Sequence, residues 1–295
     1  MHGRPVARIA VLTSRNTGGA LPPDIPAQVA RALSEDIGTG DVTAALVPAD
    51  GIANATLITR DAMLLCGTAW VDEIFRQLDP AVVVKWRAQD GAAMTANSVL
   101  CEIAGPARAI LTGERTALNF LQTLSGTATT TSQYVAAVAG TTCLILDTRK
   151  TIPGLRLAQK YAVRCGGGRN HRMGLHDMVL VKENHIIAAG SIKAAISAAR
   201  ANSPGVPVEI EVESLAEFRE ALAANPDVIM LDEFSLADMH AAVAARNAAA
   251  TAVRIEASGG FNLDGIRAVA EAGIDYISIG SLTKHLRAID LSLRF

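Results

Sequence analysis

The sequence has few aromatic side chains and no excess of charge of either sign. Aromatic residues make up only 4% of the 295 residues, although half of all residues are hydrophobic, so any core is built mainly from small aliphatic side chains. Such a chain can bury enough apolar surface to fold, which excludes disorder as its main state. The formal net charge of −2 excludes a general nucleic-acid binder, which needs a strongly basic surface.

Cysteines are also scarce. The four that occur lack CxxC spacing and the density of a disulfide-stabilised secreted domain. They are Cys66, Cys101, Cys143 and Cys165. We therefore expect reduced thiols in a cytoplasmic protein, with Cys165 in a structural role because no neighbour in the sequence would activate it.

Long hydrophobic runs are missing as well. No charge occurs between Arg115 and Asp147, but Asn, Gln, Ser and Thr interrupt this stretch, so we expect no membrane span. Residues 1–23 lack acidic side chains, yet their apolar run, Ile9 to Leu12, is too short for a secretory signal. We interpret residues 1–23 as an N-terminal extension that ends at Pro22-Pro23.

Two common catalytic motifs do not occur. There is no GxxxxGK[ST] phosphate loop and no HExxH zinc motif, and the six histidines are dispersed. The segment from Val228 to Glu233 starts like the common phosphoribosyl diphosphate loop but lacks its Thr- and Gly-rich continuation.

Residues 24–126 have the pattern of a mixed α/β domain. Helical spacing alternates there with short strands of period two. The predicted helices are 25–34, 71–78 and 114–138, the last of which continues beyond the domain, and the predicted strands are 53–60, 82–86 and 98–103.

From Cys143 the pattern changes to short apolar runs that alternate with Ala-rich helical segments. The runs are 143–147, 178–182, 208–212, 228–232, 253–257 and 276–280, and the helices are 190–202, 214–224, 236–249 and 262–273. This alternation predicts βαβ units and a parallel sheet. Because a complete TIM barrel has eight strands, we expect an incomplete α/β barrel of six or seven strands over 127–281, followed by a C-terminal segment, 282–295, that packs back on the first domain. A doubly wound open sheet is the alternative.

Positive charge is concentrated in one segment. From Asp147 to Lys182 the chain carries eight cations and two acids, whereas the rest of the chain has a net charge of −8. Three of these cations have the spacing of a solvated helix face, which is as good an explanation for them as a binding site: Arg156, Lys160 and Arg164. Arg149, Lys150 and Lys182 instead adjoin hydrophobic strands, where an unpaired charge is costly. This arrangement predicts a site for a small polyanion at the carboxyl ends of the strands.

Acidic residues follow other strands of the same sheet. Glu211 and Asp232 lie at strand ends and favour a Mg²⁺ ion that carries substrate phosphates, or sugar hydroxyls. For Glu209 and Glu213 we expect pairing with nearby Lys or Arg. The Ser258-Gly259-Gly260 segment precedes a helix predicted at residue 262 and is either a phosphate cradle or a plain βα turn. A Schiff-base lysine at position 150 or 182, as in barrel aldolases, is an alternative chemistry.

Several motifs together resemble the quinolinate phosphoribosyltransferases, and the resemblance extends in order over about residues 24–295. The DTRKT and GGGxNHR segments are the most specific of them. The matching segments are Glu35–Thr43, Gly113–Asn119, Asp147–Thr151 with Pro153-Gly154, Gly166–Arg172, Lys182–His185 and Ile255–Gly260.

This resemblance implies an N-terminal α/β sandwich domain joined to an incomplete α/β barrel, in a homodimer with a shared active site. It further implies transfer of phosphoribosyl from phosphoribosyl diphosphate to quinolinate with Mg²⁺, which gives nicotinate mononucleotide, diphosphate and CO₂ in NAD biosynthesis. Alternatives are a related phosphoribosyltransferase for another anionic heterocycle and a catalytically inactive anion-binding protein.

The resemblance also implies residue roles. The carboxylates of quinolinate would contact Arg149, His171, Arg172 and Lys182, with Arg115 from the partner subunit. Lys150 would lie between the two substrates near the transferred bond, and Glu211 and Asp232 would hold the ribose hydroxyls and, directly or through substrate, Mg²⁺. Phosphate would be bound by Ser258, Gly259, Gly260 and Gly280. Thr148, Ser281 and Lys284 complete the substrate-binding set; many relatives have His where Lys284 stands, and His285 follows it.

Overall fold

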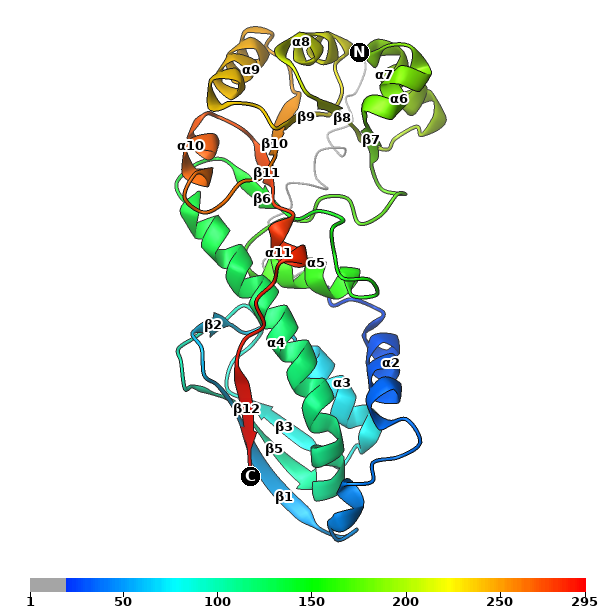
Figure 1. The fold of residues 1–295 in the computed structure, drawn as a ribbon, viewed down its shortest axis with the longest axis vertical. Coiled ribbons are helices and arrows are strands. Elements are labelled where there is room, and N and C mark those ends of the chain that lie inside the picture. Colours follow the sequence, from blue (N-terminus) through cyan, green and yellow to red (C-terminus); the bar gives the residue numbers. More distant parts are fainter. Residues whose placement is uncertain (1–19) are drawn as a thin grey trace, which may run out of the picture. The chain divides into compact units, whose positions relative to one another are not determined.

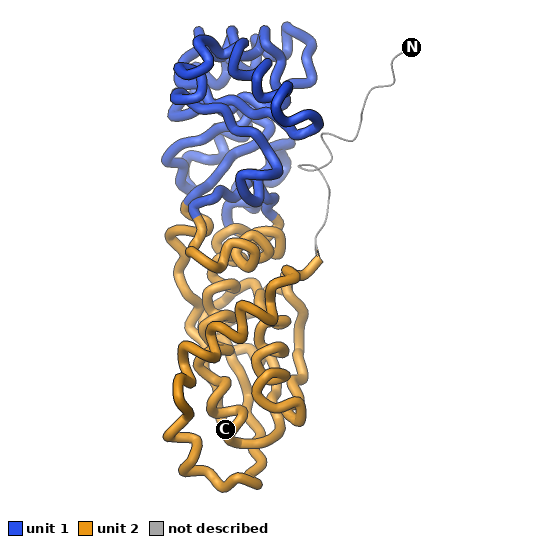
Figure 2. Tube along the Cα trace, turned by 90° about the vertical axis from the view of Figure 1, so that its right-hand side faces the viewer, with its two compact units in different colours: residues 1–15, 133–150, 168–280 blue, residues 16–132, 151–167, 281–295 orange. Residues whose placement is uncertain are grey.

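The computed structural model describes residues 20–295, so the expected extension over 1–23 lies almost entirely outside the described residues. The described chain forms two compact units (Figure 2). We name them the barrel unit, residues 133–150 and 168–280, and the sandwich unit, residues 20–132, 151–167 and 281–295. Among the described helices, none is both long and apolar enough to cross a membrane.

The barrel unit contains a six-stranded parallel sheet, which confirms the predicted fold class. The order of its strands is β6-β11-β10-β9-β8-β7 (Figure 1). They are β6 (Leu144–Leu146), β7 (Val179–Val181), β8 (Val208–Val212), β9 (Val228–Asp232), β10 (Arg254–Ser258) and β11 (Tyr276–Ser278). Five of the six lie within the apolar runs from which they were predicted, and β10 is shifted by one residue from the predicted run 253–257.

The strand order excludes the doubly wound alternative. From β7 to β11 each strand lies next to the strand that precedes it in the sequence. The strand order is not reversed along the sheet, as it is in a doubly wound fold. β6 then pairs with β11, as the first strand of a barrel does. On the other side of β6, Leu146 forms an isolated parallel bridge with Arg169, so a short seventh segment extends that edge.

Helices connect the strands of the barrel unit. Three of them start at a serine whose hydroxyl accepts a backbone N–H of the first turn, at 3.1 to 3.3 Å. The helices are α6 (Glu183–Ala189), α7 (Ile192–Asn202), α8 (Leu215–Ala224), α9 (Leu236–Ala248) and α10 (Ile266–Glu271). Helix α6 was not predicted from the sequence, and α10 begins four residues later than predicted.

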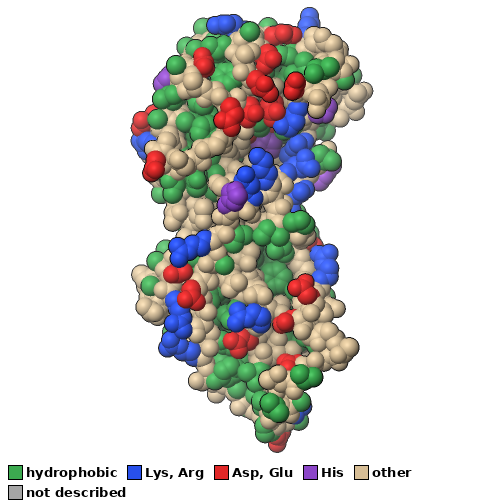
Figure 3. Space-filling model, viewed as in Figure 1, with side chains coloured by type: hydrophobic (Ala, Val, Ile, Leu, Met, Phe, Trp, Pro, Cys, Tyr) green, Lys and Arg blue, Asp and Glu red, His purple; other side chains and the backbone are tan. Residues whose placement is uncertain are grey.

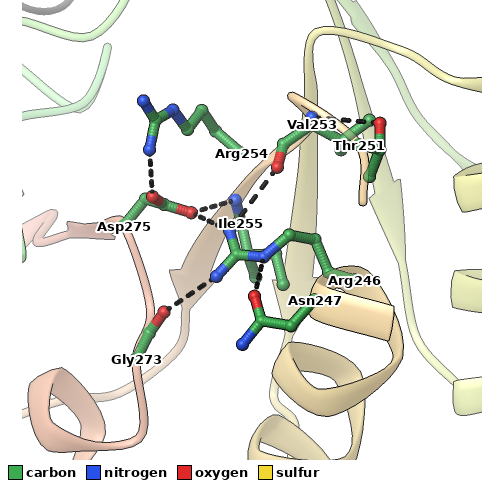
Figure 4. A network of polar contacts seen from close by, with 8 residues as sticks. All are labelled: Arg246, Asn247, Thr251, Val253, Arg254, Ile255, Gly273 and Asp275. Atoms are coloured by element: carbon green, nitrogen blue, oxygen red, sulfur yellow. Dashed lines mark hydrogen bonds and ion pairs between the residues drawn. The ribbon is translucent and has the colours of Figure 1, made fainter. Parts of the chain in front are cut away.

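Charges at the amino-terminal end of this sheet are paired (Figure 4). Asp275 accepts bonds from the guanidinium groups of Arg246 at 2.6 Å and Arg254 at 2.7 Å, and from the N–H of Ile255 at 2.9 Å. Arg246 also donates to the carbonyl oxygen of Gly273. This network connects the start of β10 to the chain before β11 and to the end of α9.

The sandwich unit has an antiparallel sheet of order β12-β1-β5-β3, with helices packed against it (Figure 1). Its core includes Trp70, whose indole N–H donates to Gln28 at 2.8 Å. The strands are β1 (Ile52–Thr59), β3 (Val83–Trp86), β5 (Val99–Pro106) and β12 (Leu291–Arg294), with a separate short pair, β2 (Met63–Leu64) and β4 (Ala93–Met94). The helices are α2 (Ile25–Ile37), the 3₁₀ turn η2 (Ala44–Leu46), α3 (Thr68–Leu78), α4 (Ala107–Ala137), α5 (Arg156–Cys165) and α11 (Ser281–Lys284).

These units differ from the expected ranges 24–126, 127–281 and 282–295. Residues 151–167, which include α5, pack with the sandwich unit rather than with the barrel strands. Helix α5 is not a solvated helix either, because Lys160 is fully buried and Ala158 and Ala162 lie in the sandwich core. The antiparallel pairing of β12 with β1 brings the C-terminal residues into the same sheet.

Candidate active site

Within the barrel unit, the carboxyl ends of the parallel strands bring the predicted site residues to one edge of the sheet. Figure 3 shows acidic and basic side chains gathered near one another on the visible face of this unit. The residues at these ends are Thr148, Arg149 and Lys150 after β6, Lys182 after β7, Glu211 in β8, Asp232 in β9, Ser258 in β10 and Gly280 after β11.

Asp147 holds the loop after α5 against the end of β6. It is fully buried, and its carboxylate accepts the amide of Asn170 at 2.6 Å and the backbone N–H of His171 at 2.9 Å. Since the N–H of Arg169 also donates to the carbonyl of Ile145, the loop follows the strand edge. The DTRK and NHR motifs, more than 20 residues apart in the sequence, are therefore neighbours.

Two arginines at this edge lie close enough to repel each other. Burial, followed by the charge of Arg149, lowers the pKa of Arg172 below its usual value. The buried Nε of Arg149 has no hydrogen-bond partner among the described residues. Cations held together in this way create a local excess of positive charge, which an anion would relieve.

Lys182, which follows β7, lies next to an acidic residue of the adjacent strand β8. Its ammonium forms an ion pair with Glu211. The lysine is exposed, whereas the Glu211 side chain is only 15% exposed. An ion-paired ammonium is not the neutral amine that a Schiff base requires, so the contact disfavours the aldolase alternative for Lys182.

Asp232 and Ser258 are directly paired neighbours at the ends of β9 and β10. After them the backbone is open, because a Cβ placed on Gly260 would meet nothing within 4 Å. The expectation that Ser258-Gly259-Gly260 lies at a helix N-terminus is wrong, since α10 begins only at Ile266. Any phosphate bound here would meet loop N–H groups without the support of a helix dipole.

Lys150 lies over the glycine that follows β11. A Cβ on Gly280 would lie 3.0 Å from Cδ of Lys150 and 3.8 Å from its Nζ. The hydroxyl of Thr148 accepts the backbone N–H of Lys150 at 3.0 Å, which orients the turn after β6. The absence of a side chain at position 280 thus leaves room for the lysine beside the open end of the sheet.

His171 is directed into the barrel interior. Its imidazole is 7% exposed, and Nε2 lies 2.9 Å from Glu209 and 3.5 Å from Glu256. The expectation that Glu209 pairs with Lys or Arg is therefore wrong. Burial and then the charge of Glu209 raise the pKa of Glu256 to about 8, although His171 opposes this shift. The predicted contact of His171 with quinolinate stays a prediction.

Glu256 was not singled out from the sequence. It alternates with apolar residues in β10, and only the strand register shows that Glu209 and Glu256 lie on one interior face. The period-two pattern of Glu209 and Glu211 in β8 was the one available signal for an acidic interior.

The remaining predicted residues belong to the sandwich unit. Arg115 is exposed on α4, and Lys284 is exposed at the end of α11. Ser281, at the start of α11, is partly buried, and His285 follows the helix as an exposed residue. The roles of these four residues at the site stay predictions.

Two family models match the chain. The quinolinate phosphoribosyl transferase N-terminal domain matches residues 41–125, and the C-terminal domain of the same family matches residues 127–294. Together they extend over most of the described chain.

Named relatives agree with these matches. A protein of Mycobacterium leprae named nicotinate-nucleotide pyrophosphorylase [carboxylating] is 41% identical over 90% of this chain and 95% of its own. The structure of the nicotinate-nucleotide pyrophosphorylase from Francisella tularensis matches with a TM-score of 0.90 and 46% identity, over 96% of this chain and 99% of its own. NadC from Streptococcus pyogenes also matches with a TM-score of 0.90, at 41% identity over 94% of this chain and 98% of its own.

Proposed function

The chain belongs to the quinolinate phosphoribosyltransferase family, and from this premise we propose which groups perform the reaction of that family here. The reaction transfers phosphoribosyl from phosphoribosyl diphosphate to quinolinate and releases diphosphate and CO₂. Its product, nicotinate mononucleotide, is a precursor of NAD.

The observation that carries this proposal is that Asp147 holds the loop with Asn170 and His171 at the end of β6, which brings the charge of Arg172 within reach of the charge of Arg149. Two guanidinium groups that repel each other in the folded protein favour a ligand with two anionic groups over one with a single charge. Quinolinate is such a dicarboxylate, and Lys182 supplies a further cation at the end of β7. Nicotinate, with one carboxylate, would leave part of this positive charge without a partner.

Transfer of the ribosyl group proceeds through a carbon with positive character, because diphosphate leaves with its electron pair. Glu211 and Asp232 supply negative charge near this carbon and accept the ribose hydroxyls. Lys150, over Gly280, stabilises the charge that develops on the leaving diphosphate. Catalysis then depends on orientation and electrostatics rather than on a covalent intermediate.

Loss of CO₂ follows from the same step. Once the ring nitrogen carries the ribose it is cationic and accepts the electrons that decarboxylation leaves behind. The carboxylate next to that nitrogen is therefore the one lost. A binding pocket that excludes water favours the neutral CO₂ over the carboxylate.

Glu211 and Asp232 also fit a magnesium ion. Both are carboxylates on neighbouring strand ends, each is only partly buried, and hard oxygen ligands are those that Mg²⁺ prefers. When bound, Mg²⁺ neutralises charge on the diphosphate of the substrate. The two residues would hold it directly or through substrate oxygens.

We extend the proposal to a homodimer in the cytoplasm. Arg115 is exposed on α4. If the partner subunit's pocket receives it, each active site contains residues of both chains. The free thiols of all four cysteines support a reducing compartment.

The test is incubation of the purified protein with quinolinate, phosphoribosyl diphosphate and Mg²⁺, with nicotinate as the matched alternative substrate. We expect nicotinate mononucleotide and CO₂ in equal amounts from quinolinate and little product from nicotinate. Comparable turnover of nicotinate, or turnover of another heterocyclic acid in preference to quinolinate, would instead support the related-transferase alternative.

The shared site has a separate test. Arg115→Ala and Lys182→Ala should each be nearly inactive, whereas a mixed dimer has one site with both residues intact. With random pairing, half of the dimers are mixed and half of their sites work, so about a quarter of the wild-type activity should return. Mixed dimers without recovery would place Arg115 outside the partner subunit's site.

A further inference from the structure

Two of the four cysteines lie next to each other in the sandwich unit. Cys66 is fully buried between β2 and α3, and Cys165 is the partly exposed last residue of α5. The two sulfur atoms and a carboxylate oxygen of Asp90 all lie within 4.8 Å of one another. The proposed reaction uses none of these groups.

Asp90 already has partners for both of its oxygens. They accept the N–H groups of Gly67 and Thr68 at the start of α3, at 3.1 Å, and the hydroxyl of Tyr161 at 2.8 Å. A metal ion at this position would have to displace these bonds. The two thiols are thus the groups of the cluster that remain available for chemistry.

Helix α4 holds both cysteine backbones in place. The N–H of Cys66 donates to the hydroxyl of Ser125 at 3.0 Å, and the same hydroxyl donates to the carbonyl of Cys66 at 3.1 Å. Next to Cys165, a Cβ on Gly166 would lie 2.5 Å from the carbonyl oxygen of Ala128, so α5 ends in close contact with α4. A disulfide requires the two sulfur atoms, which lie within 4.8 Å of each other, to approach to about 2.05 Å by rotation of their side chains.

The two thiols differ in reactivity. A hydrogen bond from Cys66, supported by Tyr161 and Arg164, lowers the pKa of Cys165 against the effects of burial and Asp90. Burial raises the pKa of Cys66 well above its usual value. Since the thiolate is the nucleophile, the partly exposed Cys165 reacts first and the buried Cys66 reacts second.

We propose that Cys66 and Cys165 are a redox modification site that a hydroperoxide converts to an intramolecular disulfide. The Cys165 thiolate attacks one peroxide oxygen, the O–O bond breaks, and for hydrogen peroxide the leaving hydroxide takes a proton to form water. Cys66 then attacks the sulfenic sulfur of Cys165, the S–O bond breaks, and a second water leaves. The peroxide is reduced, both thiols are oxidised, and a thiol reductant reverses the change.

The test uses the reduced full chain and hydrogen peroxide, and it does not depend on the proposed substrates. After peroxide is removed, the protein is alkylated under denaturing conditions and digested without reductant for mass spectrometry. We expect a peptide that joins Cys66 to Cys165, the loss of two of the four thiols, and the return of both with dithiothreitol. Cys101 and Cys143 should escape oxidation and be recovered in alkylated form, since burial raises the pKa of each thiol to about 12.

Variants assign the order of the two steps. In Cys66→Ser, Cys165 should stop as a sulfenic acid that dimedone traps, whereas in Cys165→Ser the thiol of Cys66 should survive peroxide. Cys101→Ser is the matched control and should keep the cross-link.

Three results would overturn the proposal. In the first, Cys165 of the wild type is oxidised to sulfinic acid and no cross-link forms. In the second, disulfides form only between chains, and in the third, all four thiols remain reduced. Because the cross-link is measured on the wild type, a variant that fails to fold does not remove the test.

Discussion

At the amino-terminal end of the parallel sheet, the carboxylate of Asp275 accepts hydrogen bonds from the guanidinium groups of Arg246 and Arg254 and from one backbone N–H. Opposite charges are therefore paired there. At the carboxyl end, burial and then the charge of Arg149 lower the pKa of Arg172. In the barrel interior, the carboxylates of Glu209 and Glu256 lie in one buried cluster with His171. At the amino-terminal end, then, opposite charges pair, whereas at the carboxyl end like charges also lie near each other beside the Lys182–Glu211 ion pair.

This contrast in charge indicates which end of the parallel sheet binds a ligand. Charges that pair with each other leave little to bind, and removing one partner destabilises the fold, whereas like charges held together raise the free energy of the folded state until a ligand binds. Substitutions at the two ends should thus have opposite consequences for activity and stability.

The largest expected effect is on turnover. Lys150→Ala should lower kcat by about 100-fold, the scale of the loss of one electrostatic group at the reacting centre. The KM for quinolinate should change little, because the arginines bind it. Steady-state kinetics with both substrates measure this, and Lys150→Arg is the matched control that keeps the charge. An unchanged kcat with a raised KM would make Lys150 a binding residue only.

Arg172→Gln should mainly weaken binding of the dicarboxylate. The loss of one charged hydrogen-bond donor corresponds to about 2 kcal/mol, or a rise of about 30-fold in the KM for quinolinate. The variant should also unfold at a slightly higher urea concentration than the wild type, because a repelling charge is gone. A less stable variant would contradict the comparison between the two ends.

Arg246→Gln tests the opposite end. Asp275 keeps Arg254 and one backbone N–H, so we expect the free energy of unfolding to fall by about 1–2 kcal/mol. The kcat and KM should equal those of the wild type well below the unfolding transition. Chemical denaturation and kinetics on the same preparation separate the two effects, and an altered KM would remove the functional distinction.

The smallest expected effect is a pH dependence. The pKa of Glu256 is about 8 in the folded state against 4.5 ordinarily, so between these values the folded protein binds more protons than the unfolded chain. Stability from this group is complete below pH 4.5 and is lost as the pH rises toward and through 8. We expect the melting temperature to be about 3 °C higher at pH 6 than at pH 8, and Glu256→Gln should reduce this difference. An unchanged pH dependence in Glu256→Gln would show that Glu256 is ionised in both states.

The barrel strands could be predicted from the sequence because each is a short apolar run followed by a charged or small residue. Their parallel direction followed from the helices between them. The motif at 147–151 likewise indicated a polyanion site, since cations next to hydrophobic strands need a partner. Short elements without such a pattern were missed, among them β12, whose pairing with β1 is a contact between distant residues, and α6.

Side-chain partners at the site were less predictable. Glu209 was expected to pair with Lys or Arg, yet it meets His171, which reaches it only because Asp147 holds the loop after α5 against β6. Lys160 has the spacing of an exposed helix face but is buried, since its helix packs within the sandwich unit. Such contacts join residues far apart along the chain and leave no local periodicity.

By itself, the sequence determined the strand and helix alternation, the concentration of positive charge between Asp147 and Lys182, and the family, because these depend on local composition and on specific motifs. The fold in space, and not the sequence, shows that the charge of Arg149 acts on Arg172, that His171 lies near two glutamates, and that Cys66 lies beside Cys165. The physical reason is that charge repulsion, burial and sulfur reactivity depend on distances through space, which strand register and helix packing set.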